Sequence, residues 1–214
     1  MSKTLAICLG IIAVLLVLFF MRDTHTTQQQ ASMTVTESAG TPVPHSTGAD
    51  FSDWREFTPP AGKFKVLLPG LPQHATDKFV DPTTNEPRKY ETFVAVDEHE
   101  SAFMISMITF PHAIDDKAVD EVLKSIVNEM LKRNKDNKIV SMKLGNFRYY
   151  KALDFSLANG DLVIEGKVIA HDDSLYVLSM ISKNNNYSPQ SLAYFVNSFV
   201  LIDTKTAPTA TKSK

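Results

Sequence analysis

The sequence has only one cysteine, Cys8, which lies in an apolar run near the N-terminus. The rest of the chain therefore has neither the cysteine pairs of a disulfide framework nor the thiolates of a structural zinc site. Its eight glycines are scattered rather than gathered in a phosphate-binding loop, and no serine occurs in a Gly-x-Ser-x-Gly turn. Because these signatures are missing, we expect no cofactor, no metal and no catalytic residues, and a fold stabilised by side-chain packing.

An excess of positive charge is also missing. The chain has a formal net charge of −2, and the residues outside 51–204 carry five basic and three acidic side chains. Residues 51–204 therefore have a net charge of −4. A domain that neutralises nucleic-acid phosphates needs a basic excess, so we expect no nucleic-acid partner.

The sequence does contain one long apolar run, the 17 residues from Leu5 to Met21, with Lys3 before it and Arg22 after it. As a helix this run would be about 25 Å long, within the range that spans a bilayer. We predict that residues 1–21 are a retained transmembrane anchor. The alternative is a cleaved secretory signal, but such signals have an apolar region of about 7–15 residues and a small-x-small cleavage site that is not found here.

The charges at the two ends of the run favour a cytoplasmic N-terminus, because Lys3 precedes the run whereas Arg22 is followed by an acidic residue. The interpretation is a single-pass membrane protein whose C-terminal domain is extracytoplasmic, either periplasmic or at the cell surface. Residues 22–50 are rich in Thr, Ser, Gln, Gly and Pro and are predicted to form a flexible linker. Residues 51–204 are long enough for one globular domain, and residues 205–214 are predicted to be a disordered tail.

The first half of the domain has the alternation of a β-meander. In the segment from Gly62 to Leu68, Phe64, Val66 and Leu68 recur with a period of two residues. Strands are expected at Trp54–Phe57, Gly62–Leu68, His74–Val80, Arg88–Val96 and Ala102–Phe110. Turn-forming or polar residues separate the later segments, so neighbouring strands are expected to pair antiparallel.

The period then changes to that of an amphipathic helix. Apolar residues recur at helical spacing, opposite a polar face, and these are Val119, Val122, Leu123, Ile126, Val127 and Met130. Asp115 or Asp116 is expected to cap the start of this helix. The helix should lie with its apolar stripe on a sheet.

The second half of the domain predicts four more strands and a second helix. The strands are expected at Lys138–Leu144, Arg148–Leu157, Leu162–His171 and Ser174–Ser182, with hairpin junctions at Gly145–Asn146, Ala158–Asp161 and His171–Asp173. Ser188 followed by Pro189 is typical of a helix start, and this helix should continue towards Phe199. The order of elements predicts an α+β domain, an antiparallel sheet covered by helices.

Three of these segments resemble a known family. The stretch from Phe64 to Pro72, the amphipathic helix and the stretch from Tyr194 to Phe199 are similar to the bacterial branch of the Mog1/PsbP-like α/β/α sandwich, over roughly Ser52 to Ile202. The resemblance implies a non-enzymatic adaptor or assembly domain that binds protein partners, often at a membrane, and it implies no catalytic residues. The predicted anchor is a departure from the soluble and lumenal members of that family.

Three groups of polar residues are the remaining candidates for chemistry. His171, Asp172 and Asp173 offer metal-ligating atoms, but adjacent residues in a tight turn point apart, so a solvated turn is the better interpretation. The run from Asp97 to Glu100 is expected to be a wet loop between strands. His112 has neither a serine nor a cysteine nucleophile to activate, so a structural role is expected.

Aromatic residues form a further candidate set. They are concentrated in the second half of the domain, at Phe147, Tyr149, Tyr150, Phe155, Tyr176, Tyr187, Tyr194, Phe195 and Phe199. Most should be core, although a pocket for an apolar ligand is an alternative. If Tyr149 and Tyr150 are consecutive on a strand they face opposite sides, so one of them is a candidate for contact with a partner.

The sequence thus supports three hypotheses. The first is a membrane-tethered extracytoplasmic adaptor or assembly domain that binds a protein partner and has no catalytic activity. The second is a domain that binds or senses a small apolar ligand held between sheet and helix. The third is a hydrolase whose site has no recognisable motif.

Overall fold

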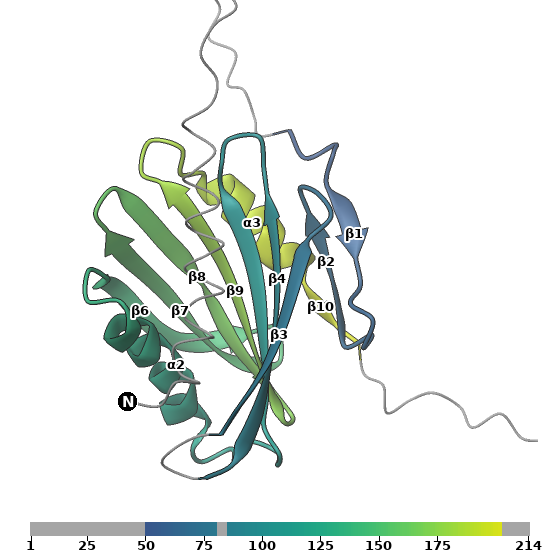
Figure 1. The fold of residues 1–214 in the computed structure, drawn as a ribbon, viewed down its shortest axis with the longest axis vertical. Helices are drawn as coiled ribbons and strands as arrows, with labels where there is room; N and C mark the ends of the chain where they lie inside the picture. Colours follow the sequence, from purple (N-terminus) through teal and green to yellow (C-terminus); the bar gives the residue numbers. More distant parts are fainter. Residues whose placement is uncertain (1–49, 81–84, 203–214) are drawn as a thin grey trace, which may run out of the picture. The chain divides into compact units, whose positions relative to one another are not determined.

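The computed structural model describes residues 50–80 and 85–202 (Figure 1). The predicted anchor at 1–21, the predicted linker at 22–50 except its last residue, and the predicted tail at 205–214 lie outside the described residues. Among the helices of the described residues, none has the length and apolar composition that a membrane span requires.

The main sheet has seven strands in the order β3-β4-β5-β9-β8-β7-β6, so β3 and β6 form its edges. All neighbouring strands are antiparallel, which confirms the predicted sheet. The strands are β3 (Gln73–Val80), β4 (Pro87–Val96), β5 (Ala102–Thr109), β6 (Lys138–Phe147), β7 (Tyr150–Asn159), β8 (Leu162–His171) and β9 (Ser174–Lys183). The pairing of β5 with β9 joins the early and late hairpins into one sheet (Figure 1).

A smaller sheet of three strands combines the two ends of the domain. Its order is β1 (Arg55–Phe57), β2 (Phe64–Leu68) and β10 (Val200–Leu201). The predicted alternation on β2 is confirmed, because Phe64, Val66 and Leu68 are at most 1% exposed. The last strand pairs with β2 and thereby fixes the C-terminal end of the domain beside its N-terminal part.

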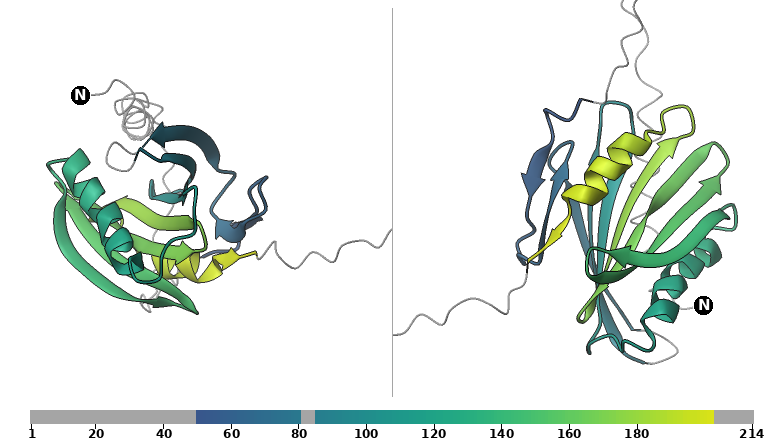
Figure 2. Two further views of the ribbon diagram at one scale, coloured as in Figure 1. Left: turned by 90° about the horizontal axis from the view of Figure 1, so that it is seen from below. Right: turned by 180° about the vertical axis from the view of Figure 1, so that it is seen from behind.

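Helix α2 (Val119–Arg133) packs on one face of the main sheet (Figure 2). Four of the six apolar residues predicted to form its stripe, Val119, Leu123, Ile126 and Val127, are buried. The other two, Val122 and Met130, are partly buried at the margin of the same cluster. On the sheet, the cluster includes Ile108, Leu153, Phe155, Leu157, Val168, Ala170, Leu175 and Val177.

Helix α3 (Pro189–Ser198) and the small sheet cover the opposite face (Figure 2). The predicted cap is confirmed, because the Ser188 side chain accepts a hydrogen bond from the Ser191 N–H at 3.1 Å. At the other end of the helix, the Ser198 hydroxyl accepts the N–H of Leu67 at 2.9 Å and so links α3 to β2. The core here is largely aromatic and includes Phe64, Phe93, Phe103, Phe195 and Phe199, each at most 2% exposed.

The predicted cap of the first helix is wrong. The residue at the N-cap position of α2 is Ala118, which provides no side-chain hydrogen bond. The Asp115 carboxylate instead accepts the N–H of Lys117 at 2.9 Å, in a turn that precedes the helix. The Asp115 carboxylate therefore bonds within its own turn instead of capping the helix, which is common for aspartate.

One predicted hairpin junction is also wrong. Gly145 and Asn146 lie within β6, opposite Ala152 and Lys151, and the two-residue turn is Arg148–Tyr149. This register places Met142 and Leu144 opposite Phe155 and Leu153, on the sheet face that α2 covers. Burial of that face overrides the local turn preference of Gly-Asn.

Candidate functional site

Exposed apolar side chains gather on the β6–β7 hairpin. Large hydrophobic residues that are exposed in the described domain include Ile139 at 47%, Val140 at 66%, Met142 at 37% and Tyr149 at 97%. The others lie elsewhere: Val80 and Val96 end β3 and β4, and Leu71 and Ile202 lie outside the strands. A hairpin with several exposed apolar side chains is a candidate surface for protein contact.

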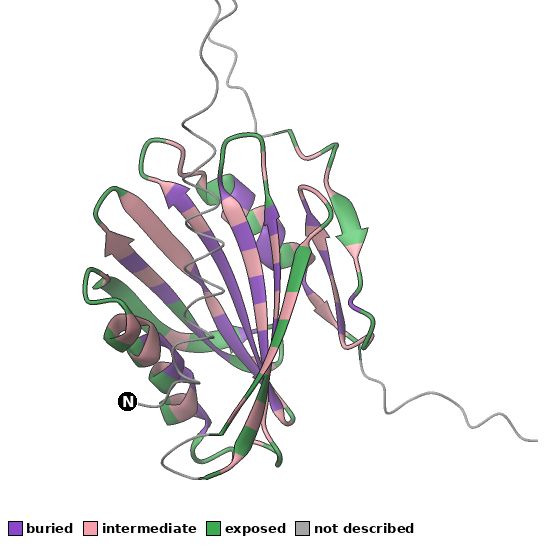
Figure 3. Cartoon of the chain, in the orientation of Figure 1, coloured by how far each residue is buried: buried purple, intermediate pink, exposed green. Residues whose placement is uncertain are grey.

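The first three of these residues lie on an edge strand. Because β6 is the last strand in the order of the main sheet, its outer side has no neighbouring strand. The six residues from Lys138 to Lys143 are all exposed, and Figure 3 shows most of β6 in the colour of exposed residues. Edge strands of this length offer a row of unpaired backbone groups to other chains.

A β-bulge divides β6 near its start. Ile139 pairs with Leu157 and Ser141 pairs with Ser156, so Val140 has no opposite residue. Beyond the bulge, Ser141 to Phe147 pair with β7 without a break. The strand is therefore regular over its second half and irregular at its exposed start.

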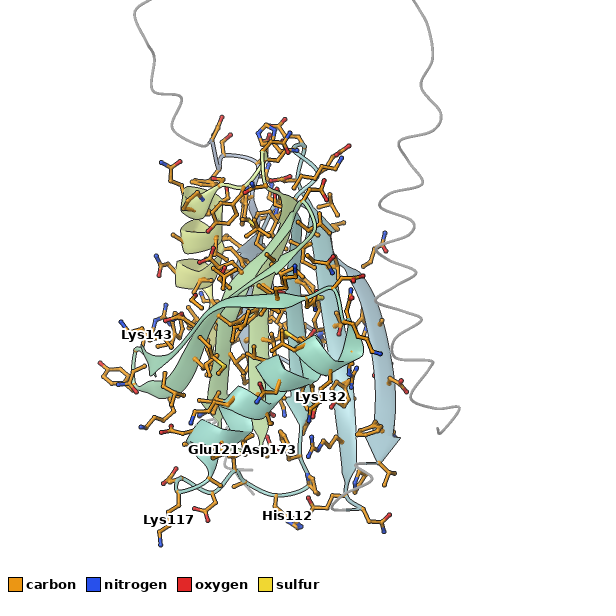
Figure 4. All side chains as sticks on the ribbon, turned by 90° about the vertical axis from the view of Figure 1, so that its left-hand side faces the viewer. His112, Lys117, Glu121, Lys132, Lys143 and Asp173 are labelled. Atoms are coloured by element: carbon orange, nitrogen blue, oxygen red, sulfur yellow. The ribbon has the colours of Figure 1, made fainter. Side chains whose placement is uncertain are left out.

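Two lysines of β6 have no acidic partner. Neither Lys138 nor Lys143 forms an ion pair within the described domain, and β6 contains no acidic residue. The nearest carboxylate in the register is that of Asp154, opposite Lys143, but this carboxylate is bonded to Lys167. Figure 4 shows Lys143 projecting outward from the sheet. The edge is thus both apolar and positively charged.

The tip of the hairpin is held against α3. Arg148 has a φ of +56°, and its guanidinium donates to the Asn197 carbonyl at 3.2 Å and lies 5.1 Å from the centre of the Phe147 ring. These contacts fix a turn residue in the left-handed region, which normally favours glycine at this position. The turn thereby exposes Tyr149 to solvent.

The two tyrosines predicted as contact candidates have different roles. Tyr149 is in the turn and almost fully exposed, whereas Tyr150 begins β7, is half-buried and packs against the core. The Tyr150 ring also lies 4.8 Å from the ring of His171. Of the pair, Tyr149 is the residue available to a partner. The premise that both lie on one strand is wrong, because Tyr149 is in the turn.

A second surface lies on the sheet face that carries α2. Val94, Met104 and Ile181 are half-buried there, beyond the residues that pack under the helix, and Ile164 is half-buried at the margin of that cluster. Ser179 lies among them, and its side-chain oxygen is fully buried without a hydrogen-bond partner. This surface is largely apolar and contains the unsatisfied Ser179 hydroxyl, which suits a small apolar ligand that has a polar group.

The predicted metal candidate forms a structural turn. Asp172, with a φ of +51°, and Asp173 are the two turn residues between β8 and β9. The carbonyls of Asp172 and Asp173 accept the N–H groups of Ile114 and Phe110, and the Asp173 carboxylate lies 3.7 Å from the ammonium of Lys63. Within residues 50–80 and 85–202, no group of three His, Cys, Asp or Glu side chains is placed to hold a metal ion.

The other polar candidates lie in loops. The Asp97 carboxylate accepts the N–H groups of His99 and Ser101, and burial raises the pKa of Asp97 despite these bonds. Glu100 pairs with Lys183 at 3.2 Å. His112 lies exposed between β5 and α2, at the same end of the domain as Asp173 (Figure 4). The structure does not bring these residues together.

The sequence interpretation missed a contact between Tyr187 and Glu165. The Tyr187 hydroxyl donates to the Glu165 carboxylate, and burial, together with this carboxylate, raises the pKa of Tyr187. The phenol therefore stays protonated near neutral pH and ties the loop before α3 to β8. No sequence pattern could have revealed it, because the two residues lie on different elements.

The aromatic residues are divided between the two faces. Phe147, Tyr176, Phe195 and Phe199 belong to the core under α3, whereas Phe155 belongs to the cluster under α2. Tyr194 stacks on Phe51, with ring centres 4.0 Å apart. The aromatics therefore do not form one cluster.

No protein-family model and no curated protein matches the sequence. The structure is similar to the solution structure of cyanobacterial PsbP (CyanoP) from Synechocystis sp. PCC 6803, with a TM-score of 0.44 and 11% sequence identity. The alignment covers 78% of this chain and 98% of that chain. At this TM-score and identity, the neighbour assigns neither a family nor a function.

Proposed function

We propose that the described domain is a non-catalytic adaptor or assembly domain that binds a protein partner through the β6–β7 hairpin. The observation that carries the proposal is that Ile139, Val140, Met142 and Tyr149 are exposed along this one hairpin, from the start of β6 to the turn. Fully burying an apolar side chain of this size contributes about 1.5–3 kcal/mol, and exposed tyrosines are frequent binding hot spots. A partner that covers the hairpin would remove four of the eight exposed large apolar side chains of the described domain from water.

The proposal includes the cellular setting that the sequence predicts. Residues 1–21 anchor the chain in a membrane, residues 22–50 act as a tether, and the domain is extracytoplasmic. A linker of this length has a root-mean-square span of about 30 Å, so the domain could reach partners near the membrane. The resemblance of residues 64–72 and 194–199 to the bacterial branch of Mog1/PsbP-like proteins supports an adaptor or assembly role.

Site-specific photo-crosslinking of the full chain in its native membrane tests the proposal. A photoreactive residue replaces Val140 on β6 or, as a control, Val80 on the opposite edge strand β3, where the native side chain is 54% exposed. We expect the probe at 140 to capture a defined protein and the probe at 80 not to capture it. Equal capture at both positions, or none at 140, would contradict the proposal.

A small apolar ligand between sheet and helix is the second candidate function. It is favoured by one specific observation, the buried Ser179 hydroxyl that has no partner on the half-buried apolar face. Native mass spectrometry of the purified full chain tests it. A bound molecule that is lost in Met104→Glu and retained in Tyr149→Ala would support ligand binding, and wild-type protein of unliganded mass would count against it.

A further inference from the structure

We infer that β6 takes up an extended segment of the partner protein as an additional strand, and that this segment alternates acidic and apolar residues. The inference rests on the proposed function and names how the partner is held. It follows from the backbone geometry of β6, from the faces of its side chains and from its charge.

The regular half of β6 has backbone groups free for pairing. Phe147 and Tyr150 flank a two-residue turn, so they bond to each other, and hydrogen-bonded pairs then recur at every second residue. By this alternation, Met142, Leu144 and Asn146 direct their N–H and C=O groups away from β7. No strand of the described domain lies on that side. A segment of about six residues could pair with them.

The side chains of β6 specify the pattern of the added strand. Met142 and Leu144 face the side of α2, together with Phe155 and Leu153, whereas Lys143 faces the other side. Residues directly opposite each other on neighbouring strands share a face. Apolar residues of the partner would therefore lie beside Met142 and Leu144, and an acidic residue would lie beside Lys143.

Charge favours a different protein over a second copy of this chain. Two paired β6 strands would bring Lys138 and Lys143 of both chains to one interface, and β6 offers no carboxylate to meet them. An acidic segment would instead supply partners for lysines that form no ion pair in the described domain. Like charges opposite each other destabilise a strand pair, and opposite charges stabilise it.

The lysines and the bulge also have a simpler explanation, because charged side chains and bulges protect edge strands from unwanted pairing. Protection alone does not account for Ile139, Val140 and Met142, which expose apolar surface at the same edge. The bulge at Val140 limits pairing to the stretch from Ser141 to Asn146. The edge can therefore pair with another strand, but only along this stretch.

Peptide binding to the purified full chain tests the inference without knowledge of the partner. The probe is the capped peptide Glu-Val-Glu-Val-Glu-Val, and the controls are its lysine counterpart and a version N-methylated at alternate residues. Nuclear magnetic resonance titration should show shifts of amide signals along 141–146 with the acidic peptide, and at least tenfold weaker binding of both controls. Absence of binding by the acidic peptide, or equal binding of its methylated version, would overturn the inference.

Variants of β6 distinguish strand addition from docking of a partner by side-chain contacts alone. Met142→Pro removes an outward N–H, which edge strands tolerate, whereas Met142→Ala removes only the side chain. We expect the proline variant to lose peptide binding and crosslinking at 140 at least tenfold relative to the alanine variant, with thermal unfolding of both variants checked by circular dichroism. Equal crosslinking in the two variants would exclude strand addition while leaving partner docking intact.

Charge reversal and self-association complete the test. Lys143→Glu should weaken binding of the acidic peptide at least tenfold and strengthen binding of the lysine peptide. Lys143→Gln should have an intermediate effect on both affinities. If sedimentation shows that the wild-type chain is a dimer and that the Met142→Pro variant is a monomer, the occupant of the edge is a second copy and the inference is wrong.

Discussion

Gly166 on β8 lies directly against the backbone of Leu178 on β9. A Cβ atom at Gly166 would be 2.0 Å from the Leu178 carbonyl oxygen and 2.8 Å from the Cα of Ser179. Backbone atoms at the centre of a seven-stranded sheet cannot move aside as the end of a side chain can. The close approach of β8 and β9 therefore depends on this glycine.

Gly166→Ala should be strongly destabilising, by about 3 kcal/mol or more, because the methyl group overlaps fixed backbone atoms. Gly145→Ala is the matched control, since a Cβ there meets nothing within 4 Å on edge strand β6. Its free energy of unfolding should change by less than about 1 kcal/mol. Urea denaturation of both variants measures the difference, and similar midpoints would contradict the prediction.

The Arg148 turn predicts a difference between two variants at one position. Arg148→Ala keeps a non-glycine residue at a φ of +56° and loses the bond to Asn197 and the contact with Phe147. Arg148→Gly loses the same contacts but relieves the left-handed backbone. The glycine variant should be more stable than the alanine variant by about 1 kcal/mol. Thermal unfolding checks this, and an alanine variant as stable as the glycine variant would show that the turn is not strained.

Ser198 links α3 to β2, and Ser125 on α2 is its matched control. Both hydroxyls donate to the carbonyl three residues earlier, at 2.7 Å, but only that of Ser198 also accepts an N–H, from Leu67. Ser198→Ala should lower the free energy of unfolding by about 1–2 kcal/mol, because it leaves the Leu67 N–H without this partner. Ser125→Ala should have an effect below about 0.5 kcal/mol. Denaturant titration compares them, and equal effects would refute a role for the Leu67 bond.

The raised pKa of Tyr176 predicts that the domain loses stability at alkaline pH. Burial raises the pKa of Tyr176 from 10.0 to about 12, so the folded state binds a proton that the unfolded state releases above pH 10. The resulting stabilisation is fully present below pH 10 and is lost as the pH rises towards 12. Its order of magnitude is about 2–3 kcal/mol.

Denaturant titrations at pH 9 and pH 11 measure this effect. Between these values, the wild-type protein should lose about 1 kcal/mol more than Tyr176→Phe. Tyr149→Phe is the control, because this side chain is 97% exposed, and it should follow the wild type. A Tyr176→Phe variant with the pH dependence of the wild type would contradict the assignment.

The two tyrosines of the β6–β7 hairpin should separate binding from stability. Tyr149→Ala removes an almost fully exposed ring, so its free energy of unfolding should stay within about 0.5 kcal/mol of the wild type. Tyr150→Ala removes a ring that packs against the core and His171 and should cost about 1–3 kcal/mol. Thermal unfolding and crosslinking at 140 test the pair. Reduced crosslinking with unchanged stability is expected only for Tyr149→Ala.

Periodicity was sufficient to predict most of the elements. The apolar spacing that predicted α2 matches the side chains that the helix buries, and the alternation of Phe64, Val66 and Leu68 matches β2. These patterns can be read from the sequence because they arise within one element, where the repeat of the backbone sets which side chains share a face. The Ser188 cap was predictable for the same reason, since its partner is three residues away.

The errors occurred where distant residues compete with local preference. Gly145–Asn146 is a good local turn, yet the hairpin turns at Arg148–Tyr149 because Leu153 and Phe155 must face α2. Asp115 is a good helix cap, yet its carboxylate serves the preceding turn. Neither outcome follows from residue type alone.

Local patterning along the chain was enough to specify an antiparallel sheet with an amphipathic helix on it, because each strand and helix carries its own apolar repeat. The identity of the edges was decided only when the strands assembled. The order that pairs β5 with β9 leaves β6 outermost, and so turns Ile139, Met142 and Lys143 into an accessible surface. Strand order is a property of contacts between distant segments, and for that reason the candidate docking surface emerges from the tertiary structure.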